Sequence, residues 1–143
     1  MNARRFEMWE FPYASVIGLA EAIRYANDIG VQNIYDYNKP LVKKLREGLS
    51  SVAGAQVLDR GSQVSNIVTF HKQGFELSNI EQVLGNNNVY YSVSLKQNAI
   101  IDFTRKGVDW AIRLSPHYFN TEKEIESIVD IIASIKKRYL FFD

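Results

Sequence analysis

The stretch DWAIRLSPHYFNTEKE, residues 109–124, decides how this chain folds. Its first half alternates, and successive side chains of a strand point to opposite faces of a sheet. In a strand over residues 109–115, the apolar face carries Trp110, Ile112 and Leu114. That face predicts the buried side of a sheet, so Arg113 is predicted to project from the opposite side, away from the core.

The second half of the same stretch predicts the start of a helix. Thr121 and Glu124, three residues apart, match the capping box, in which each side chain bonds the backbone of the other residue. The apolar residues that follow recur at helical spacing along a single stripe, and they are Ile125, Ile128, Val129, Ile132 and Ile135. Pro116 stiffens the exit from the strand that precedes this helix.

Outward from this stretch, hydrophobic periodicity predicts further helices and strands. The helices run from Tyr13–Ser15 to Gly30, from Val31 or Gln32 to Ser51, and from Asn79 to Leu84. The strands cover Gln56–Arg60, Ser65–His71, Val89–Leu95 and Ala99–Thr104. Runs of strands between helices predict an α+β fold, with a mostly antiparallel sheet and helices packed on one face.

Local signals refine these boundaries. Gly30 is predicted as the left-handed cap that ends the first helix. Pro40 lies inside the second helix, where a proline costs about 3 kcal/mol, so a kink or a restart is expected near Asn38. Ser78 followed by Glu81 predicts a second capping box.

Composition excludes several classes of protein. The chain has 143 residues, which suits one domain with a real core. Its formal net charge of +1 argues against a nucleic-acid partner, since phosphate binding needs a basic excess. The absence of cysteine excludes disulfides and a cysteine nucleophile. No window approaches the ~18 apolar residues of a membrane span. We therefore expect a cytoplasmic protein with no membrane partner.

Arg113 carries most of the information about function. Its planar guanidinium suits a carboxylate through two charge-assisted hydrogen bonds, and the alternative is a solvated surface arginine with an acid nearby. His117 could be a general acid or a donor to a ligand, or it could fix the loop after the strand, which the residues favour. His71 and His117 lie too far apart in sequence to supply a metal site alone. The residues by themselves indicate a soluble domain with one outward arginine.

Three stretches resemble class V aminotransferases, closest to the isopenicillin-N-epimerase-like branch. ARRFEMWE at 3–10, followed by IGLAEA at 17–22, resembles the segment that crosses between the two domains of that family. RLSPHYFNTE at 113–122 resembles a motif near the family's C-terminus, and residues 92–103 also resemble that branch. The resemblance implies that residues 1–12 are a crossover segment from a missing large domain. It implies that residues 13–143 are the C-terminal small domain.

The resemblance also implies a function. The family is a dimer whose large domain holds pyridoxal phosphate through a lysine Schiff base, while the small domain closes over an amino-acid substrate. Arg113 would then bind the substrate's α-carboxylate, and His117 is the second implied substrate-binding residue. No lysine of this chain matches the Schiff-base motif. We therefore expect the chain alone to be inactive and to bind no cofactor, whereas the parent enzyme is a homodimer.

The chain departs from the family pattern at a loop that matters for sulfur chemistry. Cysteine desulfurases of the family carry an Arg-Thr-Gly-His-His-Cys loop, and LKQNA at 95–99 stands here instead. Persulfide chemistry by this piece is therefore excluded. Two alternatives to the enzyme fragment remain. One is a stand-alone interaction module that uses the aromatic segment around Trp9 and Phe11, which we expect to cause self-association. The other is a small carboxylate-binding module that uses Arg113 without a cofactor.

Overall fold

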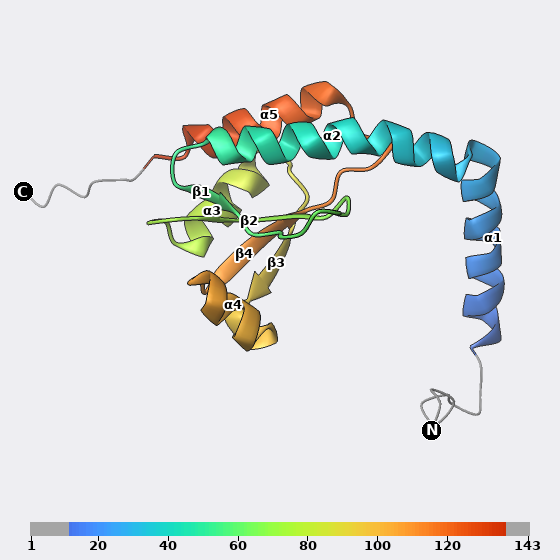
Figure 1. Cartoon of the computed structure of the whole chain (residues 1–143), viewed down its shortest axis with the longest axis horizontal. Helices are drawn as coiled ribbons and strands as arrows, with labels where there is room; N and C mark the ends of the chain where they lie inside the picture. The colour runs from blue at the N-terminus through green and yellow to red at the C-terminus, as the bar shows by residue number, and fades with distance from the viewer. Residues whose placement is uncertain (1–11, 137–143) are drawn as a thin grey trace, which may run out of the picture. The chain divides into compact units, whose positions relative to one another are not determined.

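The computed structural model describes residues 12–136. Most of the predicted crossover segment, with Trp9 and Phe11, lies outside the described residues. The described elements, drawn in Figure 1, are α1 (Tyr13–Ile29), α2 (Val31–Ser51), β1 (Ala55–Val57), β2 (Val68–Lys72), α3 (Leu77–Asn86), β3 (Ser92–Leu95), η2 (Lys96–Asn98), α4 (Ile100–Lys106), β4 (Trp110–Leu114) and α5 (Glu122–Ser134). They fall in two compact units, divided between Tyr35 and Asp36.

The first unit holds α1 and the first residues of α2. None of the 17 residues of α1 is buried within this chain, although Ile17, Leu19 and Ile23 are large and apolar. Gly30 ends α1 with a φ of 94° and a ψ of 110°, so it takes a positive φ but not the left-handed helical conformation that we predicted. Such a φ suits glycine because it has no Cβ.

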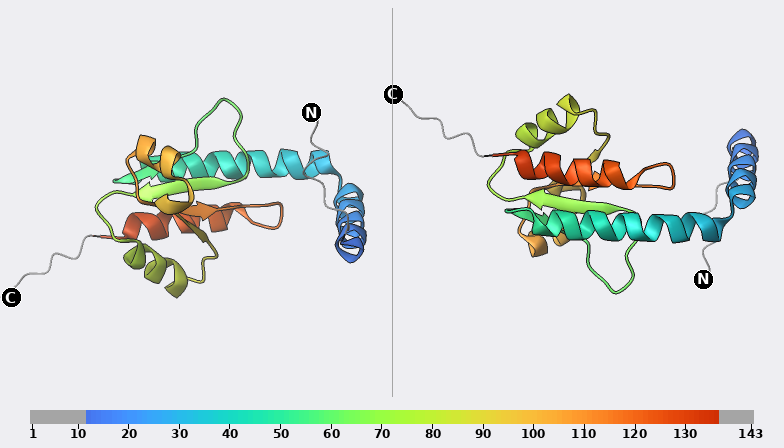
Figure 2. Two further views of the ribbon diagram at one scale, coloured as in Figure 1. Left: turned by 90° about the horizontal axis from the view of Figure 1, so that it is seen from below. Right: turned by 90° about the horizontal axis from the view of Figure 1, so that it is seen from above.

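The second unit is built on one antiparallel sheet of four strands, in the order β1-β2-β4-β3. Figure 2 shows α2 and α5 running over the same face of this sheet. The register places Arg113 of β4 between Thr69 of β2 and Ser92 of β3. The predicted α+β fold with a mostly antiparallel sheet is therefore confirmed.

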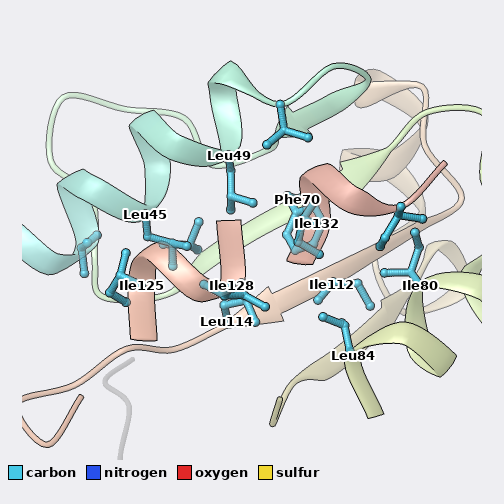
Figure 3. Close-up of a cluster of buried hydrophobic side chains, with 14 of the residues drawn as sticks. Leu45, Leu49, Phe70, Ile80, Leu84, Ile112, Leu114, Ile125, Ile128 and Ile132 are labelled. Atoms are coloured by element: carbon cyan, nitrogen blue, oxygen red, sulfur yellow. The ribbon is translucent and has the colours of Figure 1, made fainter. Parts of the chain in front are cut away.

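The core lies between the sheet and the helices α2, α3 and α5, and Figure 3 shows its central side chains. The predicted inward face of β4 is confirmed, because Trp110, Ile112 and Leu114 are all buried. Phe70 and Ile112 are fully buried. Each such side chain contributes roughly 1.5–3 kcal/mol to folding. This packing fixes β4, and with it the residue that carries the predicted site.

A smaller apolar cluster lies on the other face of β4, beneath α4, and contains Phe103, Val108 and Ala111. The prediction of a strand over 99–104 was wrong, because these residues form α4. Only Phe103 of α4 is buried. The other apolar residues of the run, Ile100 and Ile101, are exposed, so their spacing does not reflect the two faces of a strand. Gly107, with a φ of 68° and a ψ of 34°, supplies the left-handed cap at its end.

Several boundaries also differ from prediction. The capping box at Ser78 is wrong, since α3 starts at Leu77 and its N-cap, Glu76, makes no side-chain hydrogen bond. Helix α2 does not restart, because it runs as one helix through Pro40. Four apolar residues of α2 beyond the proline are buried, and their burial outweighs the ~3 kcal/mol that Pro40 costs. The predicted capping box between Thr121 and Glu124 is confirmed.

No helix in the described part of the chain combines the length and the apolar character that a membrane span requires.

Candidate functional site

Arg113 lies where its strand position predicts. Its side chain is exposed, whereas its neighbours Ile112 and Leu114 are buried. Its Nη2 donates a hydrogen bond to Oγ of Ser92 at 3.1 Å, across the β3–β4 pair. Of the ion pairs formed among residues 12–136, none involves Arg113. The guanidinium is therefore held in place while part of its donor capacity remains available to a ligand.

A cavity of about 740 Å³ adjoins Arg113. Ser92 and Arg113 form its sheet side, and Tyr90 comes from the segment before β3. Phe119 and Glu124 come from the loop before α5 and from the first turn of that helix. The volume suits a small organic molecule, since such sites span roughly 300–1,000 Å³.

His117 is not among the described residues that line this cavity. Its ring packs against Tyr118 and Phe119, with centroid distances of 4.7 Å and 5.6 Å. Its backbone N–H donates to Oδ1 of Asn120 at 2.9 Å, and its own Nδ1 is buried without a hydrogen-bond partner. These contacts fit the loop-fixing interpretation. A role for His117 in substrate binding stays a prediction.

The loop between β4 and α5 and the first turns of α5 are both bonded to α2. The hydroxyl of Tyr37 on α2 donates to the carbonyl of Asn120 at 3.1 Å. Nζ of Lys44 donates to Glu122 at 2.9 Å and to Glu126 at 2.6 Å. These hydrogen bonds, that with Glu126 first, raise the pKa of Lys44 above 10.5. Helix α2 thus fixes the cavity wall that faces Arg113.

Glu124 is the charged residue of the cavity wall that sequence reasoning missed. Its Oε2 accepts hydrogen bonds from the backbone N–H of Thr121 at 2.6 Å and from the Thr121 hydroxyl at 3.2 Å. These two bonds, the backbone one first, lower the pKa of Glu124 below 4.5. The capping box already explained this residue from sequence, so nothing in the pattern pointed to a second role.

His71, the other histidine, makes structural contacts only among those described. Nδ1 of His71 lies 3.1 Å from the carbonyl oxygen of Trp110, and the two rings pack with centroids 4.3 Å apart. Residues 12–136 contain no group of three or more His, Asp or Glu side chains placed to hold a metal ion.

Comparison with known proteins identifies the class to which this fold and site belong. The family model described as Aminotransferase class-V matches residues 2–128, so the chain belongs to the class-V aminotransferase family. The probable cysteine desulfurase 1 of Mycobacterium leprae (strain TN) is 23% identical over 132 residues, which are 92% of this chain and 21% of that protein. The probable cysteine desulfurase 2 of the same organism is 29% identical over 133 residues, 88% of this chain and 30% of that protein.

A solved structure shows the same fold. The apo structure of a cysteine desulfurase from Thermococcus onnurineus NA1 has a TM-score of 0.76 and 23% sequence identity. The match covers 92% of this chain and 33% of that one. The chain therefore spans a third or less of the length of these relatives.

Members of this family use pyridoxal phosphate, and the described residues do not by themselves fit that cofactor. No lysine is among the described residues that line the cavity. Lys72 is buried against backbone carbonyls, and Lys96 and Lys106 pair with Asp109 and Asp102. None of these three amines is placed to hold an aldehyde at the cavity, so we derive no catalytic step through the cofactor.

Proposed function

We propose that this chain is the C-terminal domain of a pyridoxal-phosphate-dependent enzyme of the class-V aminotransferase type. Its part in the reaction is to bind the α-carboxylate of an amino-acid substrate through Arg113. The observation that carries the proposal is the exposed guanidinium on the cavity wall, held by Ser92 and engaged in no ion pair among residues 12–136. An arginine fork presents parallel N–H donors that match a carboxylate.

The contribution of this domain to catalysis is orientation. A carboxylate bound at Arg113 has one end fixed, which restricts rotation of the amino acid before the reaction. When the cofactor is bound in the parent enzyme, it supplies the electron sink. The large domain of the parent supplies the Schiff-base lysine, and the parent acts as a cytoplasmic homodimer.

Among the reactions of the family, we propose amino-group transfer, epimerisation or lyase chemistry in place of a persulfide relay through this domain. The chain contains no cysteine, although several relatives are named as cysteine desulfurases. At the corresponding loop, Lys96 begins a short 3-10 helix and its Nζ donates to Asp109 at 2.9 Å. The loop thus offers an ion pair where a desulfurase of this family carries its sulfur nucleophile.

The exposed face of α1 supports the large domain as a partner. A 17-residue helix with no buried residue leaves Ile17, Leu19 and Ile23 in water, and large exposed apolar surface marks a contact with another polypeptide. We propose that this contact is the large domain of the parent, and that the isolated chain self-associates when that domain is absent.

The test is Arg113→Gln in the full-length parent. We expect kcat/KM for the amino-acid substrate to fall about 30- to 150-fold, because losing hydrogen bonds to a charged group costs roughly 2–3 kcal/mol. Arg105→Gln is the matched control, since Arg105 is exposed on α4 and does not line the cavity. Unchanged amino-acid affinity in the Arg113 variant would refute the proposed role.

A further inference from the structure

The described cavity wall carries one positive and one negative side chain. Among the described residues that line the cavity, Arg113 is the only lysine or arginine and Glu124 is the only acid. The other polar side chains there are uncharged, among them Asn87, Asn88 and Ser127. A substrate carboxylate bound at Arg113 therefore leaves no described cation on the wall for a second carboxylate.

Glu124 keeps its negative charge in this cavity. Its lowered pKa, caused by the Thr121 hydrogen bonds, means that it stays ionised at neutral pH. None of the ion pairs among residues 12–136 involves Glu124, whereas Glu122 and Glu126 on the same helix both pair with Lys44. Of the acids in these first two turns of α5, Glu124 is thus the one whose field is not offset by an ion pair.

The N-terminus of α5 already has an anion beside it, the carboxylate of Glu124 in the capping box. The first backbone N–H groups of a helix attract negative charge when they are free. Here the Thr121 side chain accepts from the backbone N–H of Glu124 at 3.3 Å, and Glu124 accepts from the backbone N–H of Thr121. The capping box already supplies that helix end with an anion.

We propose that Glu124 is a specificity-determining residue, which makes the cavity accept amino acids with neutral side chains and reject those with a second carboxylate. The proposal rests on the proposed function, because Arg113 must hold the first carboxylate. Glu124 is itself exposed, so solvent screens its charge in part, but like charges that come close together at a protein surface still repel more strongly than they do in bulk water. Rejection by repulsion is a common source of specificity.

The experiment compares glutamine with glutamate, which have nearly the same shape and differ in charge. Dissociation constants for both are measured in the full-length holoenzyme from the change in the visible absorption of the cofactor. We expect the wild type to prefer glutamine by about tenfold or more. Glu124→Gln should reduce this preference at least about fivefold by tightening glutamate binding alone. Glutamine at this position can still act in the capping box, so the helix start is kept.

Glu122→Gln is the matched control. It removes the neighbouring acid of the same helical turn, which does not line the cavity, and Lys44 keeps its ion pair with Glu126, which still ties α5 to α2. We expect it to leave the preference unchanged. A second variant, Ser127→Asp, adds a carboxylate to the wall and should increase the preference for glutamine, so the proposal remains testable if Glu124→Gln folds poorly.

The outcomes separate this inference from the proposed function. If Arg113→Gln weakens both amino acids but neither Glu124→Gln nor Ser127→Asp changes their ratio, the specificity role is wrong and the carboxylate role stands. If Glu122→Gln changes the ratio of the glutamate and glutamine dissociation constants as much as Glu124→Gln does, the specificity role of Glu124 is also wrong. The effect would then come from the net charge of the protein. If neither amino acid binds, or Arg113→Gln affects neither, both proposals fail together.

Discussion

Lys72 offers the sharpest test of how the domain is held together. Its side chain is 2% exposed, and its Nζ donates to the carbonyl of Ile132 at 3.0 Å and to that of Ala53 at 3.3 Å. Ile132 lies in the last turn of α5, and Ala53 follows the end of α2. The amine also lies 5.3 Å from the centre of the Phe75 ring. One ammonium thus joins the C-terminal ends of two helices, where the helix dipoles favour a cation.

The size of its contribution follows from these contacts. Each hydrogen bond from a charged donor is worth about 1.5–3 kcal/mol, and its loss leaves a carbonyl unsatisfied. The cost of burying an ammonium opposes this gain. We expect Lys72→Met, which keeps most of the stem volume, to lower the free energy of unfolding by about 2–3 kcal/mol. Lys72→Ala also removes three methylene groups at about 0.8 kcal/mol each, for a total of about 4–6 kcal/mol.

Urea denaturation of the two variants, followed by circular dichroism, measures both numbers. The Met variant isolates the amine, and the difference between the Ala and Met variants isolates the packing of the stem. A Met variant as stable as the wild type would refute the reasoning. It would mean that the desolvation of the charge cancels the hydrogen bonds.

The pH dependence gives an independent check. Burial lowers the pKa of Lys72 below 10.5 in the folded state, so the unfolded chain binds more protons at alkaline pH. Stability therefore rises with pH between the folded pKa and 10.5, as linkage requires. The free energy of unfolding of the wild type, relative to that of Lys72→Met, should therefore increase as the pH rises through this window. A constant difference between the two proteins would show that the pKa is not lowered.

Three further substitutions test the packing and the capping of α5. A methyl group at Gly48 would lie 2.6 Å from Cγ2 of Val129, so Gly48→Ala should lose about 1 kcal/mol in urea denaturation although alanine favours helices, and Val129→Ala should reverse that loss. Thr121→Ala should cost about 1 kcal/mol at neutral pH through loss of the cap. Alanine keeps the backbone N–H that chiefly lowers the pKa of Glu124 and removes only the hydroxyl bond, so this loss should shrink only slightly as the pH falls below 4.5; no loss at pH 7 would argue against the capping box.

The parts of the fold that sequence predicted are those where burial follows a single period. The apolar residues of β4 alternate, so the pattern placed Ile112 inside and Arg113 outside, although Ala111 on the second face is also buried, beneath α4. The stripe of α5 is equally regular, and Ile125, Ile128 and Ile132 are buried as predicted. In both elements the main core decides the orientation of the large apolar side chains.

The errors have a different origin. The run at 99–104 contains Ile100 and Ile101, which are 63% and 70% exposed, so its apolar residues do not report the core of this chain. The capping pattern at Ser78 failed because α3 already begins at Leu77, so Ser78 lies inside the helix, and Glu81 accepts a hydrogen bond from Tyr91 instead. Such contacts between distant residues leave no periodic signal.

The candidate site was only partly predictable for a related reason. Arg113 was found because alternation placed it opposite the core, and Ser92 became its partner only through the pairing of β3 with β4. Glu124 was assigned to the capping box, and the cavity that it also lines forms only when α5 packs near β4. A site assembled from three elements needs their tertiary arrangement.

The alternation that folds the domain also fixes the charge of the site. Arg113 stands between Ile112 and Leu114, so a slip of β4 by one residue would bury the guanidinium and expose both apolar neighbours. Glu124 is placed in the same way, because Ile125 next to it is buried against the core. The burial of adjacent residues thus holds Arg113 and Glu124 in place. Both charges are positioned before a substrate binds. Substitutions of Ile112 or Ile125 should therefore disturb substrate binding and stability together, whereas Arg113→Gln and Glu124→Gln, which can keep the capping box, should change binding with little effect on stability.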